Sequence, residues 1–187
     1  MSRNPNISLL AYKGKKPVIH PSVLLCDGVR IIGDVEIGED SSIWFNTVIR
    51  GDVNYIRLGK RVNVQDMCML HVTNGKFPLT LEDDVSVGHS VSLHGCVLRS
   101  GCLVGIGAIV LDGAEIGRGA LVAAGTLVRE GVAVPPNTLF AGAPGRVIRE
   151  LTDKDRERVG NTSPHYVAYA AEYKSEFGHI FDNYIDD

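Results

Sequence analysis

The sequence predicts an all-β protein whose chain coils into a triangular prism, a parallel β-helix of about six turns, followed by a C-terminal α-helical segment. The first observation is an aliphatic residue at every sixth position through residues 19–134. The second is composition: sixteen of the 21 glycines lie between Ile19 and Val132, but only four of the twelve aromatic residues do. Short repeats of this kind build solenoids, because one unit cannot bury its apolar face alone and must stack on its neighbours.

The period of six covers eighteen hexads. It slips by three residues after Ile49 and by five after Leu70, and it loses one residue after Leu93. Four residues after the aliphatic position, the side chain is Val, Ser, Thr, Ala or Cys in seventeen of the eighteen hexads. Each hexad then makes one short flat face, and three hexads make one turn. A β-sandwich would instead show alternation with period two over longer strands and more aromatic residues.

The chain divides into five segments on this reading. We expect an N-terminal lead-in, the hexapeptide-repeat prism, a connecting turn, C-terminal helices that pack on the prism, and a tail, over residues 1–18, 19–134, 135–151, 152–178 and 179–187. Pro135-Pro136 is expected to stop the repeat. Thr152 is expected to cap a first helix, and Ser163 with Pro164 is expected to open a second one. A helical stripe is expected to pack against the prism and contains Tyr166, Tyr169 or Ala170, Tyr173 and Phe177.

Composition excludes several classes of partner. The net charge is −3 and the basic residues are scattered, so the sequence predicts no nucleic-acid binding. No apolar stretch approaches the ~20 residues that span a bilayer, and no secretory signal layout is visible, so we expect a cytoplasmic protein without a membrane partner. The four cysteines have no metal-knuckle spacing and are expected to be reduced thiols.

Polar residues fall into two columns when the hexads are assigned to faces of the prism. Arg50, His71 and His94 are each the second residue of a hexad on one face, whereas Asp66 and His89 are each the third residue on a neighbouring face. Gln65 lies beside Asp66. Apolar residues frame this polar island, which is the pattern of a buried interface that contains a site; they are Ile32, Trp44, Phe45, Ile106 and Leu111.

Three imidazoles with an open fourth position form a catalytic zinc set. His71 and His94 stack, but side chains on different outward faces diverge, so we expect His89 to come from a second copy. Face-to-face packing around a threefold axis then gives a homotrimer with three equivalent metal sites. Each histidine taken singly would be a surface or interface group, and that interpretation is kept for His20, His165 and His179.

The ordered set Arg50-Gly51-Asp52, Asn63-Val64-Gln65-Asp66, Leu70-His71 and Gly88-His89 followed by His94 resembles the signature of the γ-class carbonic anhydrases, a family of left-handed β-helix proteins with hexapeptide repeats. The resemblance implies the left-handed coil and the reversible hydration of CO2 to bicarbonate by metal-bound hydroxide at trimer interfaces. It implies that His71, His89 and His94 bind Zn2+, or Fe2+ or Co2+.

The same resemblance suggests roles for the neighbouring residues. Arg50 and Asp52 would form an ion pair that helps hold the trimer, and Gln65 would orient the hydroxide. Asp66 and Asn63 would position the site and CO2.

The sequence departs from the family where a proton shuttle is expected. In the archetypal member a glutamate stands on an acidic loop soon after the Arg-x-Asp motif, and another carboxylate lies near the first histidine. This chain has Val53-Asn54-Tyr55 and Thr73-Asn74-Gly75-Lys76 there. Buffer, Tyr55 or another donor would have to replace the glutamate.

Three other functions stay open at this point. Hexapeptide acyltransferases use the same prism with one histidine as general base, and a thioesterase-like role toward acyl-CoA is a related possibility. A trimeric scaffold that is stabilised by metal and catalytically weak is the third. The ordered set of three histidines favours the metal enzyme over acyl transfer, which needs one histidine and no metal.

Overall fold

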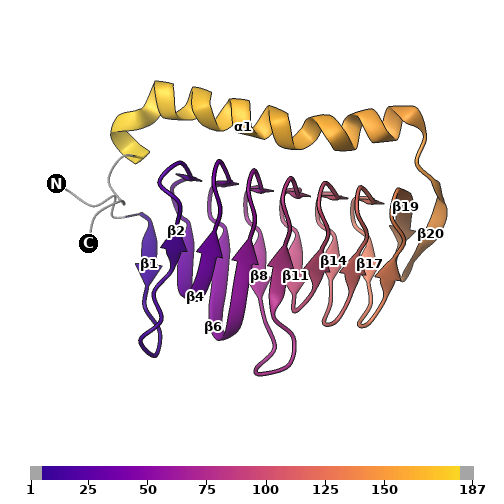
Figure 1. The fold of residues 1–187 in the computed structure, drawn as a ribbon, viewed down its shortest axis with the longest axis horizontal. Coiled ribbons are helices and arrows are strands. Elements are labelled where there is room, and N and C mark those ends of the chain that lie inside the picture. Colours follow the sequence, from indigo (N-terminus) through magenta and orange to yellow (C-terminus); the bar gives the residue numbers. More distant parts are fainter. Residues whose placement is uncertain (1–5, 182–187) are drawn as a thin grey trace.

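The computed structural model of the protein describes residues 6–181, and within them the chain forms a coil of parallel strands with a long helix beside it (Figure 1). The coil has three flat faces. The long strands β4 (Arg30–Ile37) and β6 (Val48–Leu58) run around one corner, so they join two faces into one twelve-stranded sheet. The third face is a separate sheet of eight strands. This is the predicted left-handed hexapeptide β-helix.

The strands distribute regularly over the three faces. Face 1 contains the first halves of β4 and β6 together with β1 (Ser8–Leu10), β8 (Met69–His71), β11 (Ser92–His94), β14 (Ile109–Val110) and β17 (Leu127–Val128). Face 2 contains the second halves of β4 and β6 together with β2 (Val18–Ile19), β9 (Leu79–Leu81), β12 (Val97–Leu98), β15 (Glu115–Ile116) and β18 (Ala133–Val134). Face 3 contains β3 (Leu24–Leu25), β5 (Ser42–Ile43), β7 (Asn63–Val64), β10 (Ser86–Val87), β13 (Leu103–Val104), β16 (Leu121–Val122), β19 (Thr138–Gly142) and the antiparallel β20 (Gly145–Glu150).

The coil has about seven turns within residues 6–181, one more than the hexad count predicts. The additional strands lie at its two ends, where β1 pairs with β4 and β19 pairs with β16. Pro135-Pro136 does not stop the repeat, contrary to the prediction from the sequence. The N–H groups of each turn donate to carbonyls of the following turn, as the Gly117 N–H donates to the Val134 carbonyl at 2.9 Å, so the last turn needs no N–H donor for the ladder. A proline in the last turn of face 2 therefore removes no ladder bond. Phe140 then fills the next inward position and is 4% exposed.

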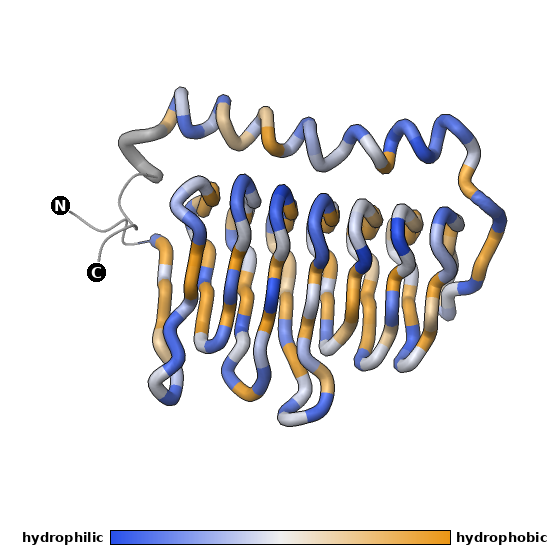
Figure 2. Tube along the Cα trace, in the orientation of Figure 1, coloured by the Kyte–Doolittle hydropathy of each residue, from blue (hydrophilic) through white to orange (hydrophobic). Residues whose placement is uncertain are grey.

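The inward aliphatic residues form one continuous core along the axis, as the period of six predicts. Figure 2 shows hydrophobic residues recurring in every turn of the coil. The first two slips in the repeat are insertions between face 1 and face 2. Gly33 of β4 pairs with Gly51 of β6, and Val35 pairs with Ile56. The chain takes two steps between these pairs in β4 but five in β6, so β6 has three extra residues that bulge outward. The second slip is a loop closed by an antiparallel bridge between Thr73 and Phe77.

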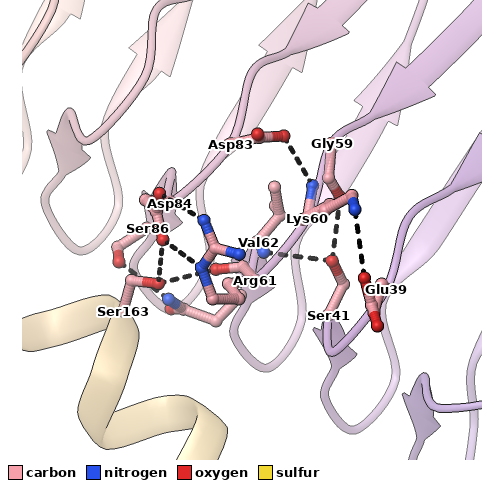
Figure 3. Close-up of polar contacts among 11 residues, drawn as sticks. Glu39, Ser41, Gly59, Lys60, Arg61, Val62, Asp83, Asp84, Ser86 and Ser163 are labelled. Carbon is pink, nitrogen blue, oxygen red and sulfur yellow. Dashed lines mark hydrogen bonds and ion pairs between the residues drawn. The ribbon is translucent and has the colours of Figure 1, made fainter.

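The C-terminal region forms one long helix, α1 (Asp153–Phe181), which is kinked at Phe177 but is not divided at Ser163, where the second of two helices was predicted to begin. Its start is the predicted one: the Asp155 N–H donates to Thr152 Oγ1 at 3.2 Å, and the Thr152 N–H donates to Asp155 Oδ2 at 2.8 Å. Ser163 does not cap a second helix. Its hydroxyl donates instead to the carbonyl of Arg61 at 2.7 Å, in a corner of the coil where Arg61 also pairs with Asp84 (Figure 3).

Helix α1 runs along the length of the coil (Figure 1) and contacts β3, β5 and β7 of face 3. The predicted stripe provides the contact: Trp44 packs edge-on against Tyr166 and Tyr173, with ring centroids 5.5 and 4.9 Å apart. Phe45 packs against the same cluster. Trp44 and Phe45 are therefore covered by the chain's own helix, which corrects the prediction that they frame an interface with another copy.

The remaining composition-based expectations concern the thiols and the membrane. All four cysteines are free and buried, and burial raises the pKa of Cys26 and Cys68 to about 12, so both are protonated at neutral pH. In residues 6–181 the structure contains no helix with the length and apolar character needed to cross a bilayer.

The close stacking of turns makes a glycine prediction. A Cβ at Gly105 would lie 2.6 Å from the backbone nitrogen of Ala124 in the next turn, so Gly105→Ala should lower the free energy of unfolding by about 2 kcal/mol or more. Gly160→Ala is the matched control: this helical position has open space, and alanine should raise the stability by about 1 kcal/mol. Chemical denaturation of both variants measures the difference. Equal stabilities would show that the turns are not packed at this distance.

Candidate metal centre

Two of the predicted histidines lie next to each other on face 1. His71 of β8 and His94 of β11 are register partners in adjacent turns, and the Nδ1 of His71 lies 3.0 Å from the Nε2 of His94. Arg50 is in the preceding turn, because Ile49 of β6 pairs with Leu70 of β8. The predicted column of Arg50, His71 and His94 is therefore present in the structure.

The second predicted column lies on face 3. The Nδ1 of His89 lies 2.7 Å from the Oδ2 of Asp66, and the backbone N–H of Ser90 donates to the Asp66 carbonyl at 2.8 Å. The two residues thus stack in adjacent turns, each two residues after the end of its strand, β7 or β10. The His89 side chain is 44% exposed, whereas that of His71 is 17% exposed. His89 therefore faces outward at the corner of the coil.

Each of the three histidines has one ring nitrogen at hydrogen-bond distance from an aspartate. Besides the pair of His89 and Asp66, the Nε2 of His71 lies 3.1 Å from Asp52 Oδ1, and the Nδ1 of His94 lies 2.6 Å from Asp112 Oδ1. Ionised carboxylates only accept, so in each case the histidine donates and its other nitrogen keeps a lone pair.

The sequence reasoning missed Asp112. It is the third residue of its hexad, so it falls outside the second-residue column that contains His94. The pair of Asp66 and His89 gave no signal for it, because those two residues share one position of the hexad, whereas Asp112 and His94 do not.

The aspartates around the histidine pair are held in their ionised form. Burial would raise the pKa of Asp52, but hydrogen bonds from Arg50 and His71 outweigh it and bring the pKa below its usual range. Burial would also raise the pKa of Asp112, but hydrogen bonds from Thr73 and His94 outweigh this effect, and the pKa is again below its usual range. Burial lowers the pKa of His71, which favours the neutral ring that metals bind.

Arg50 and Asp52 form an ion pair of 2.6 Å within one chain. Asp52 thereby bridges Arg50 and His71, a contact that the resemblance did not include. Tyr55, the suggested proton donor, stacks on another residue of β6: the guanidinium carbon of Arg57 lies 4.8 Å from its ring centroid. The structure shows no contact of Tyr55 with the histidine pair among the described residues.

Gln65 and Asn63 lie on face 3 and are buried, at 6% and 1% exposure. The Gln65 amide donates to Asn63 Oδ1 at 3.2 Å, and the Asn63 amide donates to Ser86 Oγ at 2.7 Å. The two side chains are thus fixed in orientation by a short hydrogen-bonded chain.

The spacing of His71 and His94 is compatible with two ligands of one zinc ion. Within the described part of one chain, no three His, Cys, Asp or Glu side chains are grouped to hold a metal. The 3.0 Å between the facing nitrogens of His71 and His94 is close to the ~3.3 Å between two ligands of a tetrahedral zinc ion at ~2.0 Å each. Two histidines are fewer than the three protein ligands of a typical catalytic zinc site.

Comparisons with known proteins agree with the fold. Residues 16–51 match the model of the bacterial transferase hexapeptide (six repeats). The chain is 50% identical to a carbonic anhydrase of Geobacillus kaustophilus (strain HTA426), over 88% of this chain and 90% of that protein. It is 56% identical to the uncharacterised transferase YtoA of Bacillus subtilis (strain 168), over 87% of this chain and 95% of that protein. A crystal structure of a putative acetyltransferase from Bacillus cereus superposes with a TM-score of 0.89 at 53% identity, over 91% of this chain and 99% of that chain.

A three-faced coil of six-residue repeats with a helix along one face defines a hexapeptide-repeat protein of the left-handed β-helix class. Relatives named carbonic anhydrase, at 37 to 50% identity, narrow the class further. The chain belongs to the γ-class carbonic anhydrase-like family.

The buried amide chain makes a prediction that is independent of metal. Asn63→Ala leaves the Gln65 amide and the Ser86 hydroxyl without their partner, so the metal-free protein should lose about 1–3 kcal/mol of unfolding free energy. Thr80→Ala is the control, because Thr80 lies between two buried leucines of β9 and points outward from face 2. Denaturation in the presence of a chelator measures both variants, and equal losses would contradict the proposed network.

Proposed function

We propose that the protein is a metal-dependent carbonic anhydrase that catalyses the reversible hydration of CO2 to bicarbonate. His71 and His94 of one copy and His89 of a second copy would hold Zn2+, or Fe2+ or Co2+, in a homotrimer. The observation that carries the proposal is the set of three histidines, each oriented by an aspartate through one ring nitrogen, in a family with members named carbonic anhydrases.

The exposed surface around His89 supports a shared site. Met67, Met69, Ile106 and Ile109 are 65, 46, 56 and 42% exposed and lie in the turns next to His89 or at the adjoining edge of face 1. Large exposed apolar side chains around a polar group are typical of an interface with a site inside it. We infer that this corner of one copy packs against face 1 of the next copy, which brings His89 to the His71–His94 pair.

A bound zinc ion lowers the pKa of a water molecule to about 7 and so supplies a nucleophile at neutral pH. The protein residues orient the groups around it. Asp52, Asp66 and Asp112 fix the three imidazole rings, and Gln65, held by Asn63, would present its amide to the nucleophile in one orientation.

Hydration of CO2 also releases a proton, which has to leave the site. The bulge of β6 and the loop after β8 carry no carboxylate at the positions where the resemblance expects one, and Tyr55 is stacked on Arg57. We therefore propose that small buffer molecules carry most of the protons.

Acyl transfer is the competing function, because two similar proteins carry transferase or acetyltransferase names. That chemistry needs one histidine as general base and no metal. A protein that contains no metal as purified and shows no CO2 hydration after loading would support acyl transfer or a scaffold.

The shared site predicts complementation between two inactive variants. His71→Ala and His89→Ala should each lose most of their bound zinc and some trimer stability. After equal amounts are unfolded together and refolded with zinc, about one quarter of interfaces should pair an intact His71–His94 with an intact His89. Metal analysis of the purified trimers should therefore recover about a quarter of the wild-type content.

Each variant refolded alone is the control for that experiment, and His165→Ala, an exposed position on α1, should keep full metal content. A monomer with stoichiometric zinc would contradict the shared site. So would a mixture that recovers no more metal than the separate variants.

The missing carboxylate predicts modest CO2 hydration that rises with the concentration of an imidazole-type buffer. Val53 is 37% exposed in the bulge of β6 and follows Asp52, so Val53→Glu should weaken the buffer dependence, whereas Val53→Gln, of the same length, should not. Gln65→Ala should lower the rate about 10-fold to 100-fold at every buffer concentration. Stopped-flow hydration assays measure all three variants. The proposal fails if trimers loaded with zinc, iron or cobalt show no hydration at any buffer level.

A further inference from the structure

One carboxylate near the histidine pair belongs to neither predicted column and connects the site to a loop. Asp112 follows β14 on face 1, one turn beyond His94. Its Oδ1 lies 2.6 Å from the Nδ1 of His94, and the hydroxyl of Thr73 donates to its Oδ2 at 2.6 Å. Both oxygens of the carboxylate are therefore engaged, one by the histidine and one by a residue of the loop after β8.

The loop that carries Thr73 is itself fixed. The amide of Asn54 donates to the Thr73 carbonyl at 3.1 Å, and the Thr73 N–H donates to the Phe77 carbonyl at 3.0 Å. Phe77 lies against the glycine corners of the next two turns: a Cβ at Gly95 would be 2.7 Å from Phe77 Cβ, and one at Gly113 would be 3.0 Å from its ring. The chain thus folds a loop over two turns and places one hydroxyl on Asp112.

We propose that Asp112, held in place by Thr73, is a positioning residue that fixes the ring orientation and tautomer of His94 for metal binding; this inference rests on the proposed function. Because the carboxylate accepts the Nδ1 proton, the Nε2 of His94 keeps its lone pair and faces the Nδ1 of His71. The loop after β8 lacks the carboxylate expected for proton export. In this chain its Thr73 holds Asp112, which in turn orients His94.

The geometry assigns separate tasks to the two residues. Asp112 sets the tautomer of His94, so Asp112→Asn should weaken zinc binding most. The amide group can donate to Nδ1 and so move the histidine proton to Nε2, the nitrogen that would bind the metal. Thr73 only limits the rotation of Asp112, so its loss should do less. Thr73→Ser keeps the hydroxyl and should therefore keep the zinc affinity of the wild type.

The test is zinc affinity, measured on the full-length protein by competition with a chromogenic chelator. Asp112→Asn should bind zinc 10-fold to 100-fold more weakly, Thr73→Val less than 10-fold more weakly, and Thr73→Ser like the wild type. Glu115→Gln is the matched control: this carboxylate is also on the outside of the coil but pairs with Arg99 on face 2, and its zinc affinity should be unchanged.

Two further measurements separate positioning from general stability. Thermal unfolding of the metal-free variants reports whether each still folds, and the absorption spectrum of the cobalt-loaded protein reports the geometry around the ion. Asp112→Asn should alter that spectrum, and Glu115→Gln should not. If Asp112→Asn proves unfolded without metal, the comparison of Thr73→Val with Thr73→Ser decides the question.

The outcomes distinguish this inference from the proposed function. Wild-type affinity and an unchanged cobalt spectrum in Asp112→Asn would overturn the role of Asp112 while leaving the metal site intact. Equal weakening in Thr73→Val and Thr73→Ser would overturn the role of the Thr73 hydroxyl. A wild-type protein that binds no zinc would instead overturn the proposed function.

Discussion

The stacking of inward aliphatic side chains at one strand spacing is the constraint on which the rest of this structure depends. Parallel neighbours in a sheet lie ~4.8 Å apart, so residues at equal positions in successive turns are held in straight columns by the backbone ladder. His71 and His94 face each other because Leu70 and Leu93 are stacked in the core. The polar site thus needs no loop of its own to place its first two histidines.

This regularity explains why so much could be predicted from sequence. The period of six located the inward residues, and counting outward from them placed Arg50, His71 and His94 on one face and Asp66 and His89 on another. Two of the three slips were informative as well, because each proved to be an insertion between two intact turns. Such inferences succeed where the position of a side chain follows from the backbone alone.

The features that could not be predicted depend on how far side chains reach and on what docks from elsewhere in the chain. Asp112 contacts His94 in the neighbouring turn, although the two residues occupy different positions of the hexad. Counting residues at equal positions therefore does not find this pair. Trp44 and Phe45 look like interface residues until α1 covers them. Ser163, followed by Pro164, looks like a helix cap in the sequence, but its hydroxyl donates to the Arg61 carbonyl and the helix continues through it. In each case a contact with a distant residue overrides the local signal.

Helix α1 has a consequence for how the chain reaches this structure. A solenoid is nearly one-dimensional, and its turns can form one after another from the first. Here the face of the earliest turns, around Leu24 and Trp44, is covered by Ala170 and Tyr173, and Lys174 donates to the carbonyl of Ser22, 152 residues away. The first turns therefore stay incompletely buried until almost the whole chain has been synthesised. Once α1 has docked, it ties the two ends of the coil together and opposes fraying from the N-terminal end.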